Sequence, residues 1–246
     1  MISTSLDFYN ENKHIPYKLP APPDENLNDY QLCDWLLNRS DFSWLELDVQ
    51  FDVNKWQEEI LSCKDFLVPH RDSESSGWES ACIHGIDIQS TGAWTRYGYK
   101  NEDDVPYHWT ELADQCPNIK KFWSEFPYDS YRRIRIMAVK PGGCINPHSD
   151  MPGKLPGEEN FDALKFGVPI NVAVIHPKEC YMSLKGHGVV PFKEGKAFLI
   201  NIRNYHSVIN FSDEIRYHII AHGKLQNKTD KFVKLISDSF RKQFVK

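Results

Sequence analysis

Residues 132–150 read RRIRIMAVKPGGCINPHSD, an alternating run that leads through a glycine turn into a second short run. Alternation of apolar and polar residues with period 2 is typical of a half-buried β-strand. More short runs of strand-forming residues follow, with turn residues between them and no helical stretch. They read KFGVPINVAVI (165–175), ECYMSLK (179–185), KAFLINI (196–202), HSVINF (206–211) and IRYHIIAH (215–222). Several strands at this spacing predict a mainly β sandwich or barrel.

The segments that flank these strands have a different character. Residues 1–79 begin as a polar, proline-rich arm that we expect to be extended, followed by a short predicted helix at 52–66. A second helix is predicted at 117–126. The last segment, 226–246, places its apolar residues on one stripe, which predicts an amphipathic helix that either covers the sheet or forms a homodimer. We therefore expect a single domain with its β core at 80–225, decorated by helices on both sides.

The composition excludes several classes of protein. The chain has 246 residues, of which 41% are hydrophobic and 26% charged, as is typical of a soluble globular protein. Its net charge is −5 and it has no long basic run, so no nucleic-acid partner is expected. We expect neither a membrane span nor a secretory signal. The six cysteines include no CxxC pair, which predicts free thiols in a reducing, cytoplasmic setting.

The motif PHSD is the sharpest local signal of chemistry. It places His148 and Asp150 two residues apart after a predicted strand, where side chains at i and i+2 point the same way. His206 begins a later β run. Two histidines and one carboxylate make the facial triad of non-haem iron(II), which leaves positions open for oxygen and a co-substrate. An HxD pair alone is a weak signal, because it also occurs by chance in surface turns.

Two further features strengthen the interpretation as a metal site. Arg216 follows His206 by ten residues, inside another strand-like run. An arginine beside a metal suits the bidentate binding of a dicarboxylate. The glycines of KPGG precede the HSD motif and provide the tight turn that a strand connection requires.

Taken together, RIRIMAVKPGGCINPHSD, ALKFGVPINVAV and FKEGKAFLINIRNYHSVINFSDEIRYHII resemble the aspartyl/asparaginyl/prolyl hydroxylase branch of the iron(II)- and 2-oxoglutarate-dependent oxygenases. The resemblance covers residues 131–222. It implies a double-stranded β-helix, also called a jelly roll or cupin-like fold, with flanking α-helices. It also implies iron(II) bound by His148, Asp150 and His206, and 2-oxoglutarate held through its C5 carboxylate by Arg216. The implied reaction uses O2 and releases succinate and CO2 while hydroxylating an amino acid or an Asp, Asn or Pro residue of a peptide.

Several weaker candidates surround this predicted centre. Many family members have an arginine and a histidine in the strand after HxD, where this chain has Lys165 and Gly167. Lys165 is therefore a candidate for binding the co-substrate, although an ammonium cannot reproduce the guanidinium fork. His218 shares the strand face of Arg216 and is a second candidate, with an ordinary core histidine as the alternative. The candidates for binding substrate are Arg135, Asn210, Trp94 and Arg96. The segment 151–162 is predicted to be a lid or a plain surface loop.

Two other functions stay open at this point. A jelly-roll metal protein of another class, such as a cupin-like isomerase or a small-molecule sensor, would keep the metal but would not require Arg216. A non-catalytic binding module would keep the triad only as a vestige. The identity of the substrate cannot be read from the sequence.

Overall fold

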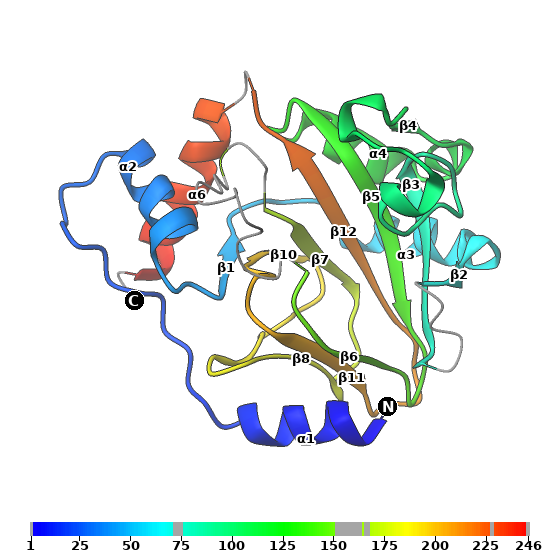
Figure 1. The fold of residues 1–246 in the computed structure, drawn as a ribbon, viewed down its shortest axis with the longest axis horizontal. Coiled ribbons are helices and arrows are strands. Elements are labelled where there is room, and N and C mark those ends of the chain that lie inside the picture. The colour runs from blue at the N-terminus through cyan, green and yellow to red at the C-terminus, as the bar shows by residue number, and fades with distance from the viewer. Residues whose placement is uncertain (1, 71–75, 151–163, 165–167, 227–228, 245–246) are drawn as a thin grey trace.

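The computed structural model describes residues 2–70, 76–150, 164, 168–226 and 229–244, and its core is two antiparallel β-sheets (Figure 1). The larger, 8-stranded sheet has the order β1 (Trp44–Leu47), β10 (Lys196–Ile200), β7 (Ile170–Ile175), β12 (Arg216–Lys224), β5 (Ser130–Val139), β3 (Trp78–Gly85) and β2 (Val68–Pro69), with β4 (His108–Trp109) paired to β3. The smaller, 4-stranded sheet has the order β6 (Cys144–His148), β11 (His206–Asn210), β8 (Cys180–Leu184) and β9 (Gly188–Val189).

The chain alternates between the two sheets as it runs from β5 to β12. Strands β5, β7, β10 and β12 form the centre of the larger sheet, and β6, β8, β9 and β11 form the smaller one. The last strand, β12, lies between β7 and β5, so the first and last strands of the eight are neighbours. This alternation is the topology of a double-stranded β-helix, which confirms the predicted jelly roll with flanking helices.

The turn between β5 and β6 has a specific backbone requirement that the sequence meets with glycine. Gly142 has a φ of 67°, in the left-handed region that favours glycine. A Cβ on Gly143 would lie 2.8 Å from the Lys140 carbonyl oxygen and 2.9 Å from the Ser76 carbonyl oxygen. The predicted KPGG turn therefore fixes how β6, and the HSD motif at its end, leaves the larger sheet.

Helices cover the outer faces of both sheets. The predicted helices are present as α3 (Val53–Ser62), α4 (Pro117–Glu125) and α6 (Thr229–Phe244), and α2 (Asp29–Asp34) packs against α6. The apolar stripe of α6 buries Phe232, Ile236 and Phe240 in the main hydrophobic cluster of the chain. Within the part of the chain that is described, no helix is both long and apolar enough to cross a membrane.

The N-terminal arm differs from the prediction, because it begins with a helix. Helix α1 (Ile2–Asn12) runs along the outside of the smaller sheet, against β6, β11 and β8 (Figure 1). The prolines that favour extended chain start only at Pro16, after α1 has ended. Buried Ser5 and Phe8 supply the sheet-facing side of the helix.

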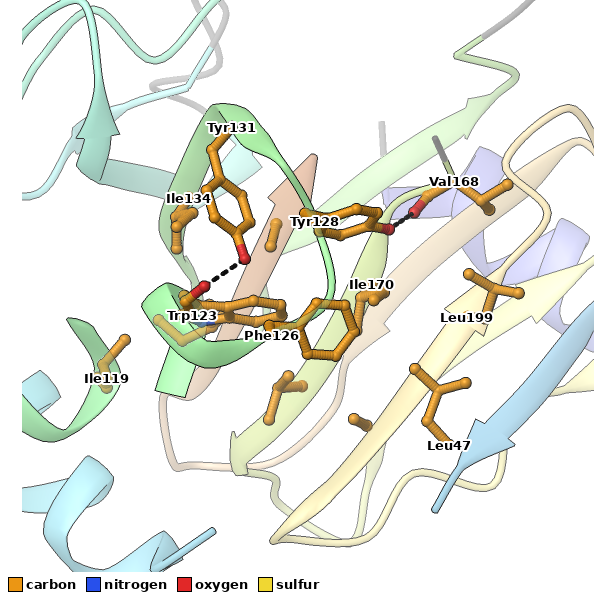
Figure 2. Packing of buried hydrophobic residues seen from close by; sticks show 14 of the residues in the cluster. Leu47, Ile119, Trp123, Phe126, Tyr128, Tyr131, Ile134, Val168, Ile170 and Leu199 are labelled. Carbon is orange, nitrogen blue, oxygen red and sulfur yellow. Dashed lines mark hydrogen bonds between the residues drawn. The ribbon is translucent and has the colours of Figure 1, made fainter. Parts of the chain in front are cut away.

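The main apolar core lies between the larger sheet and its helices, and it is rich in aromatic rings. Figure 2 shows Trp123 and Phe126 side by side near Ile170 of β7, with ring centroids of the two aromatics 5.1 Å apart. Tyr128 donates a hydrogen bond to the Val168 carbonyl oxygen at 2.7 Å, and its ring stacks on Phe232. This core holds the outer face of the larger sheet, so the inner face is left to line a pocket between the sheets.

Candidate active site

A pocket between the two sheets brings the predicted ligands and Arg216 together. Its lining includes the side chains of the three predicted metal ligands and of Arg216 and Arg135. Much of the remaining lining is apolar and comes from both sheets, including Ile145, Met182, Ile200 and Val208. A mostly apolar cavity with a few converging polar groups is the usual form of a small-molecule site.

The three predicted ligands converge because β6 and β11 are paired at this point. His148, the last residue of β6, is the register partner of His206, the first residue of β11, and the two ring centroids are 4.4 Å apart. Asp150 follows by two residues, and its backbone N–H donates to the Ile202 carbonyl oxygen at 3.2 Å. One ligand atom from each of the three side chains lies within 4.8 Å of the others.

Backbone hydrogen bonds fix which ring nitrogens face this point. The Nδ1 atom of His148 lies 2.7 Å from the Asn146 carbonyl oxygen, and Nδ1 of His206 lies 2.9 Å from that of Asn204. A carbonyl oxygen only accepts, so each Nδ1 carries a hydrogen, and in the neutral form of each ring the lone pair is on Nε2. The Nε2 atoms lie 3.5 Å and 4.0 Å from the two oxygens of Asp150. Two imidazoles oriented by carbonyls, with one carboxylate, fit a divalent metal such as iron(II).

Arg216 is a buried cation in the same pocket. It is the first residue of β12, only 2% of its surface is exposed, and its Nη2 lies 2.7 Å from Nδ1 of His218. Burial lowers the pKa of Arg216 to about 10, so the guanidinium is still charged at neutral pH. Among the described residues, no carboxylate lies within the 4.0 Å of an ion pair with it. A buried charge of this kind is costly unless an anion joins it.

Only some of the other residues predicted to bind co-substrate or substrate lie near this pocket. His218 and Arg135 lie on the pocket-facing side of the larger sheet, and Nη1 of Arg135 donates to the Thr91 carbonyl oxygen at 2.9 Å. Trp94 and Arg96 lie in a 3-10 turn of the loop that follows Thr91, and neither lines the pocket. Lys165 and the predicted lid at 151–162 lie outside the described residues.

Asn210 lies at the opposite end of β11 from the metal ligands. Its Nδ2 donates to the carbonyl oxygens of Val139 at 3.0 Å and Glu214 at 2.8 Å, and its Oδ1 accepts from the Ser212 hydroxyl. The side chain therefore holds the β5 end and the β11–β12 turn together. It is not part of the pocket lining.

The pocket contains further polar residues that the sequence analysis did not select. Asn171, the second residue of β7, is one of them. His222 also lines the pocket, on the same face of β12 as Arg216 and His218. Both had a usable signal: Asn171 is a lone polar residue within INVAVI, and His222 continues the alternation that contains Arg216.

The fold and the site define a class of protein: a jelly roll with two histidines and one carboxylate that could hold a metal, and with a buried arginine in the same pocket. Residues 52–224 match the family model described as aspartyl/asparaginyl beta-hydroxylase. This match spans well over half of the chain, so the chain belongs to the aspartyl/asparaginyl beta-hydroxylase family. The family predicted from the sequence motifs is confirmed, and with it the assignment as a hydroxylase.

Solved structures with similar folds are distant. A viral collagen prolyl hydroxylase from Paramecium bursaria chlorella virus 1, solved with 2-oxoglutarate, is 11% identical with a TM-score of 0.45, covering 76% of this chain and 98% of its own. A Trichoplax adhaerens prolyl hydroxylase, solved with a hypoxia-inducible-factor peptide fragment, is 10% identical with a TM-score of 0.48, covering 82% and 93%. A Pseudomonas putida prolyl-4-hydroxylase is 13% identical with a TM-score of 0.43, covering 81% and 100%. A search of curated proteins finds no match.

Proposed function

We propose that this protein is an iron(II)- and 2-oxoglutarate-dependent hydroxylase that acts on an amino acid or on an Asp, Asn or Pro residue of a peptide, releasing succinate and CO2. The observation that carries this proposal is Arg216, a charged side chain that is 2% exposed and lines the pocket of the metal ligands. A simple metal-binding jelly roll has no use for such a cation. A dicarboxylate co-substrate supplies the anion that it lacks.

In this proposal the metal is held by Nε2 of His148, Nε2 of His206 and the carboxylate of Asp150. Iron(II) bound there supplies the activation of O2 that is coupled to the oxidation of 2-oxoglutarate. The protein contributes geometry: the Asn146 and Asn204 carbonyls hold the two imidazoles in the correct tautomer. The apolar lining limits the water that can reach the reacting groups.

The substrate end of the pocket has its own cation. Arg135 is 4% exposed, and we propose that it binds a carboxylate of the substrate. Its Nη1, like that of Arg133, donates to the carbonyl oxygen of Thr91, so the loop that carries Trp94 and Arg96 is attached to β5 at this place. This loop would then form one side of the substrate entrance, which is a role for Trp94 and Arg96 outside the lining itself.

Release of succinate from 2-oxoglutarate by the iron-loaded protein tests the proposal. We expect turnover with an amino acid or peptide substrate, found by screening, and none after His148→Ala or His206→Ala. Arg216→Ala should leave metal affinity intact and weaken binding of 2-oxoglutarate by at least about tenfold, because a charge-assisted hydrogen bond is lost. Arg216→Lys should recover part of the affinity.

The same measurements separate the alternatives. A cupin-like isomerase or sensor would bind the metal, release no succinate, and tolerate Arg216→Ala without any change in 2-oxoglutarate binding. A binding module with a vestigial triad would fail to bind iron(II) under anaerobic conditions. His187→Ala is a suitable control, because this histidine lies outside the pocket lining.

A further inference from the structure

Arg216 begins a cluster of hydrogen-bonded polar side chains formed with His218, Asn171 and His176, and of these three neighbours Asn171 also lines the pocket. Nδ1 of His218 lies 2.7 Å from Nη2 of Arg216 and 2.6 Å from Oδ1 of Asn171. On the other side of the ring, Nε2 of His218 lies 3.0 Å from Nδ1 of His176. Asn171 is 5% exposed and His218 is fully buried, so solvent does not complete their hydrogen bonds.

Arg216 determines the tautomer of the two histidines. A guanidinium can only donate, so Nδ1 of His218 has to be an unprotonated acceptor. The single hydrogen of a neutral His218 is then on Nε2, where it points at Nδ1 of His176. That nitrogen in turn has to accept, which places the hydrogen of His176 on its own Nε2. The charge of Arg216 therefore sets which ring nitrogens donate and which accept in both His218 and His176.

The charge state of the histidines agrees with this pattern. Burial, followed by the positive charge of Arg216, lowers the pKa of His218 well below its usual range and that of His176 to about 3. Both rings are therefore neutral near neutral pH in the ligand-free protein.

The cluster then has more donors than acceptors. Nδ1 of His218 has one lone pair, yet both Arg216 and Asn171 lie within hydrogen-bond distance of it. The Asn171 atom nearest to Nδ1 is Oδ1, which can only accept, so the amide fits an unprotonated Nδ1 only when it is turned over and its NH2 group faces the ring. In that orientation two donors, the guanidinium of Arg216 and the amide of Asn171, converge on one lone pair, and one of them lacks a full acceptor. A carboxylate, which has two oxygens and only accepts, would satisfy both donors.

We propose that Asn171 is the second donor to the distal carboxylate of the co-substrate, beside Arg216, and that the neutral pair His218–His176 is the positioning device that holds both. This inference rests on the proposed function, because it takes the ligand of Arg216 to be a dicarboxylate. The co-substrate site would then bind its anion with one cation and one amide.

The test compares two ligands that differ only in the distal carboxylate. Binding of 2-oxoglutarate and of 2-oxopentanoate, which has a methyl group in its place, is measured by calorimetry on protein loaded with Mn(II). The variants are Asn171→Leu, which keeps the approximate volume without a donor, Asn171→Ser, which restores a shorter donor, and His187→Ala as control. Metal affinity and thermal stability are measured for each.

We expect Asn171→Leu to weaken 2-oxoglutarate binding by about tenfold or more and to leave 2-oxopentanoate and Mn(II) binding within about twofold of wild type. Asn171→Ser should recover part of the preference for the dicarboxylate. A general structural fault would weaken both ligands alike. Equal loss for both ligands, or an unchanged preference for 2-oxoglutarate, would overturn the role of Asn171.

A second measurement addresses the positioning pair directly. In nitrogen-15 NMR spectra, we expect both His218 and His176 to carry their hydrogen on Nε2, with no titration between pH 6 and 8. A hydrogen on Nδ1 of His218, or a titration in that range, contradicts the proposed pair. If wild type itself does not prefer 2-oxoglutarate, and Arg216→Ala changes nothing, the proposed function fails. If only Asn171 proves indifferent, the proposed function stands and this inference alone falls.

Discussion

The two faces of β12 differ in what they do, although they alternate along one nine-residue strand. The outward side chains Tyr217, Ile219 and Ala221 are buried in the apolar cluster beneath the helices. The inward side chains include Arg216 and His218, which are equally buried but polar. Burial alone therefore does not separate core from site. Burial of the outward apolar side chains stabilises the folded state. Burial of the inward charged side chain destabilises it, and a bound anion would offset that cost.

The largest stability effect should follow from truncating the outward face. Ile219 is fully buried, and Ile219→Ala should lower the free energy of unfolding by about 2–5 kcal/mol. Binding of 2-oxoglutarate to the folded protein should be unchanged, because Ile219 faces away from the pocket. Urea denaturation and calorimetry at a temperature where the variant is folded measure the two quantities. A large loss of ligand affinity would mean that the two faces are not independent.

Substitution of a polar residue on the inward face should not lower the free energy of unfolding, in contrast to Ile219→Ala. Arg216→Met removes a buried cation and keeps much of the side-chain volume. In the absence of ligand, the variant should be as stable as wild type or more stable by up to about 4 kcal/mol, the upper end of the range found when buried ion pairs are replaced by apolar groups. A clear destabilisation of ligand-free Arg216→Met in urea would indicate that Arg216 holds the fold together and is not primarily a ligand-binding group.

A third change probes the place where β12 meets the aromatic core. A Cβ on Gly223 would lie 2.2 Å from ring atoms of Tyr128, so Gly223→Ala forces the ring to move. We expect a cost of about 1–3 kcal/mol, as for overpacking in general. Tyr128→Leu on the same background should relieve part of it, and a double-mutant cycle in urea measures the coupling. Additive effects of the two substitutions would contradict a direct clash.

The smallest effect concerns pH and belongs to the inward face. The pKa values of His176 and His218 are lowered by burial and by Arg216, so both rings stay neutral in the folded chain while the unfolded chain binds protons below about pH 6.5. The contribution of the two histidines to the free energy of unfolding is therefore fully present above that pH. It is lost as the pH falls, by up to about 1.4 kcal/mol per pH unit for each histidine. Urea denaturation of the metal-free protein at pH 7.5 and 5.5 measures this slope. His218→Gln should make it shallower, and an unchanged slope would contradict a neutral His218.

The sequence predicts β12 and its neighbours well because the period of 2 is a local property. It also brings His148, Asp150 and His206 together, since a strand end and a strand start can be recognised from short motifs. Asn171 had a local signal as a lone polar residue within INVAVI, but the sequence does not show which residues its side chain meets. The contact between His176 and His218 depends on how β7 pairs with β12, which no local pattern contains. Helix α1 was missed because the proline-rich chain after it dominated the composition of the arm.

The central position of β12 in the larger sheet has a consequence for how the chain matures. This strand is made last of the eight, yet one edge of β5 and one edge of β7 pair only with it. During synthesis those two strands have open edges until residue 224 has left the ribosome, and open edges are the usual starting points of aggregation. The arrival of β12 closes the sheet and delivers Arg216 to the pocket in one step. A nascent chain would therefore acquire the proposed co-substrate site only when its β-sheet is complete, and a product truncated before β12 should be both insoluble and unable to bind 2-oxoglutarate.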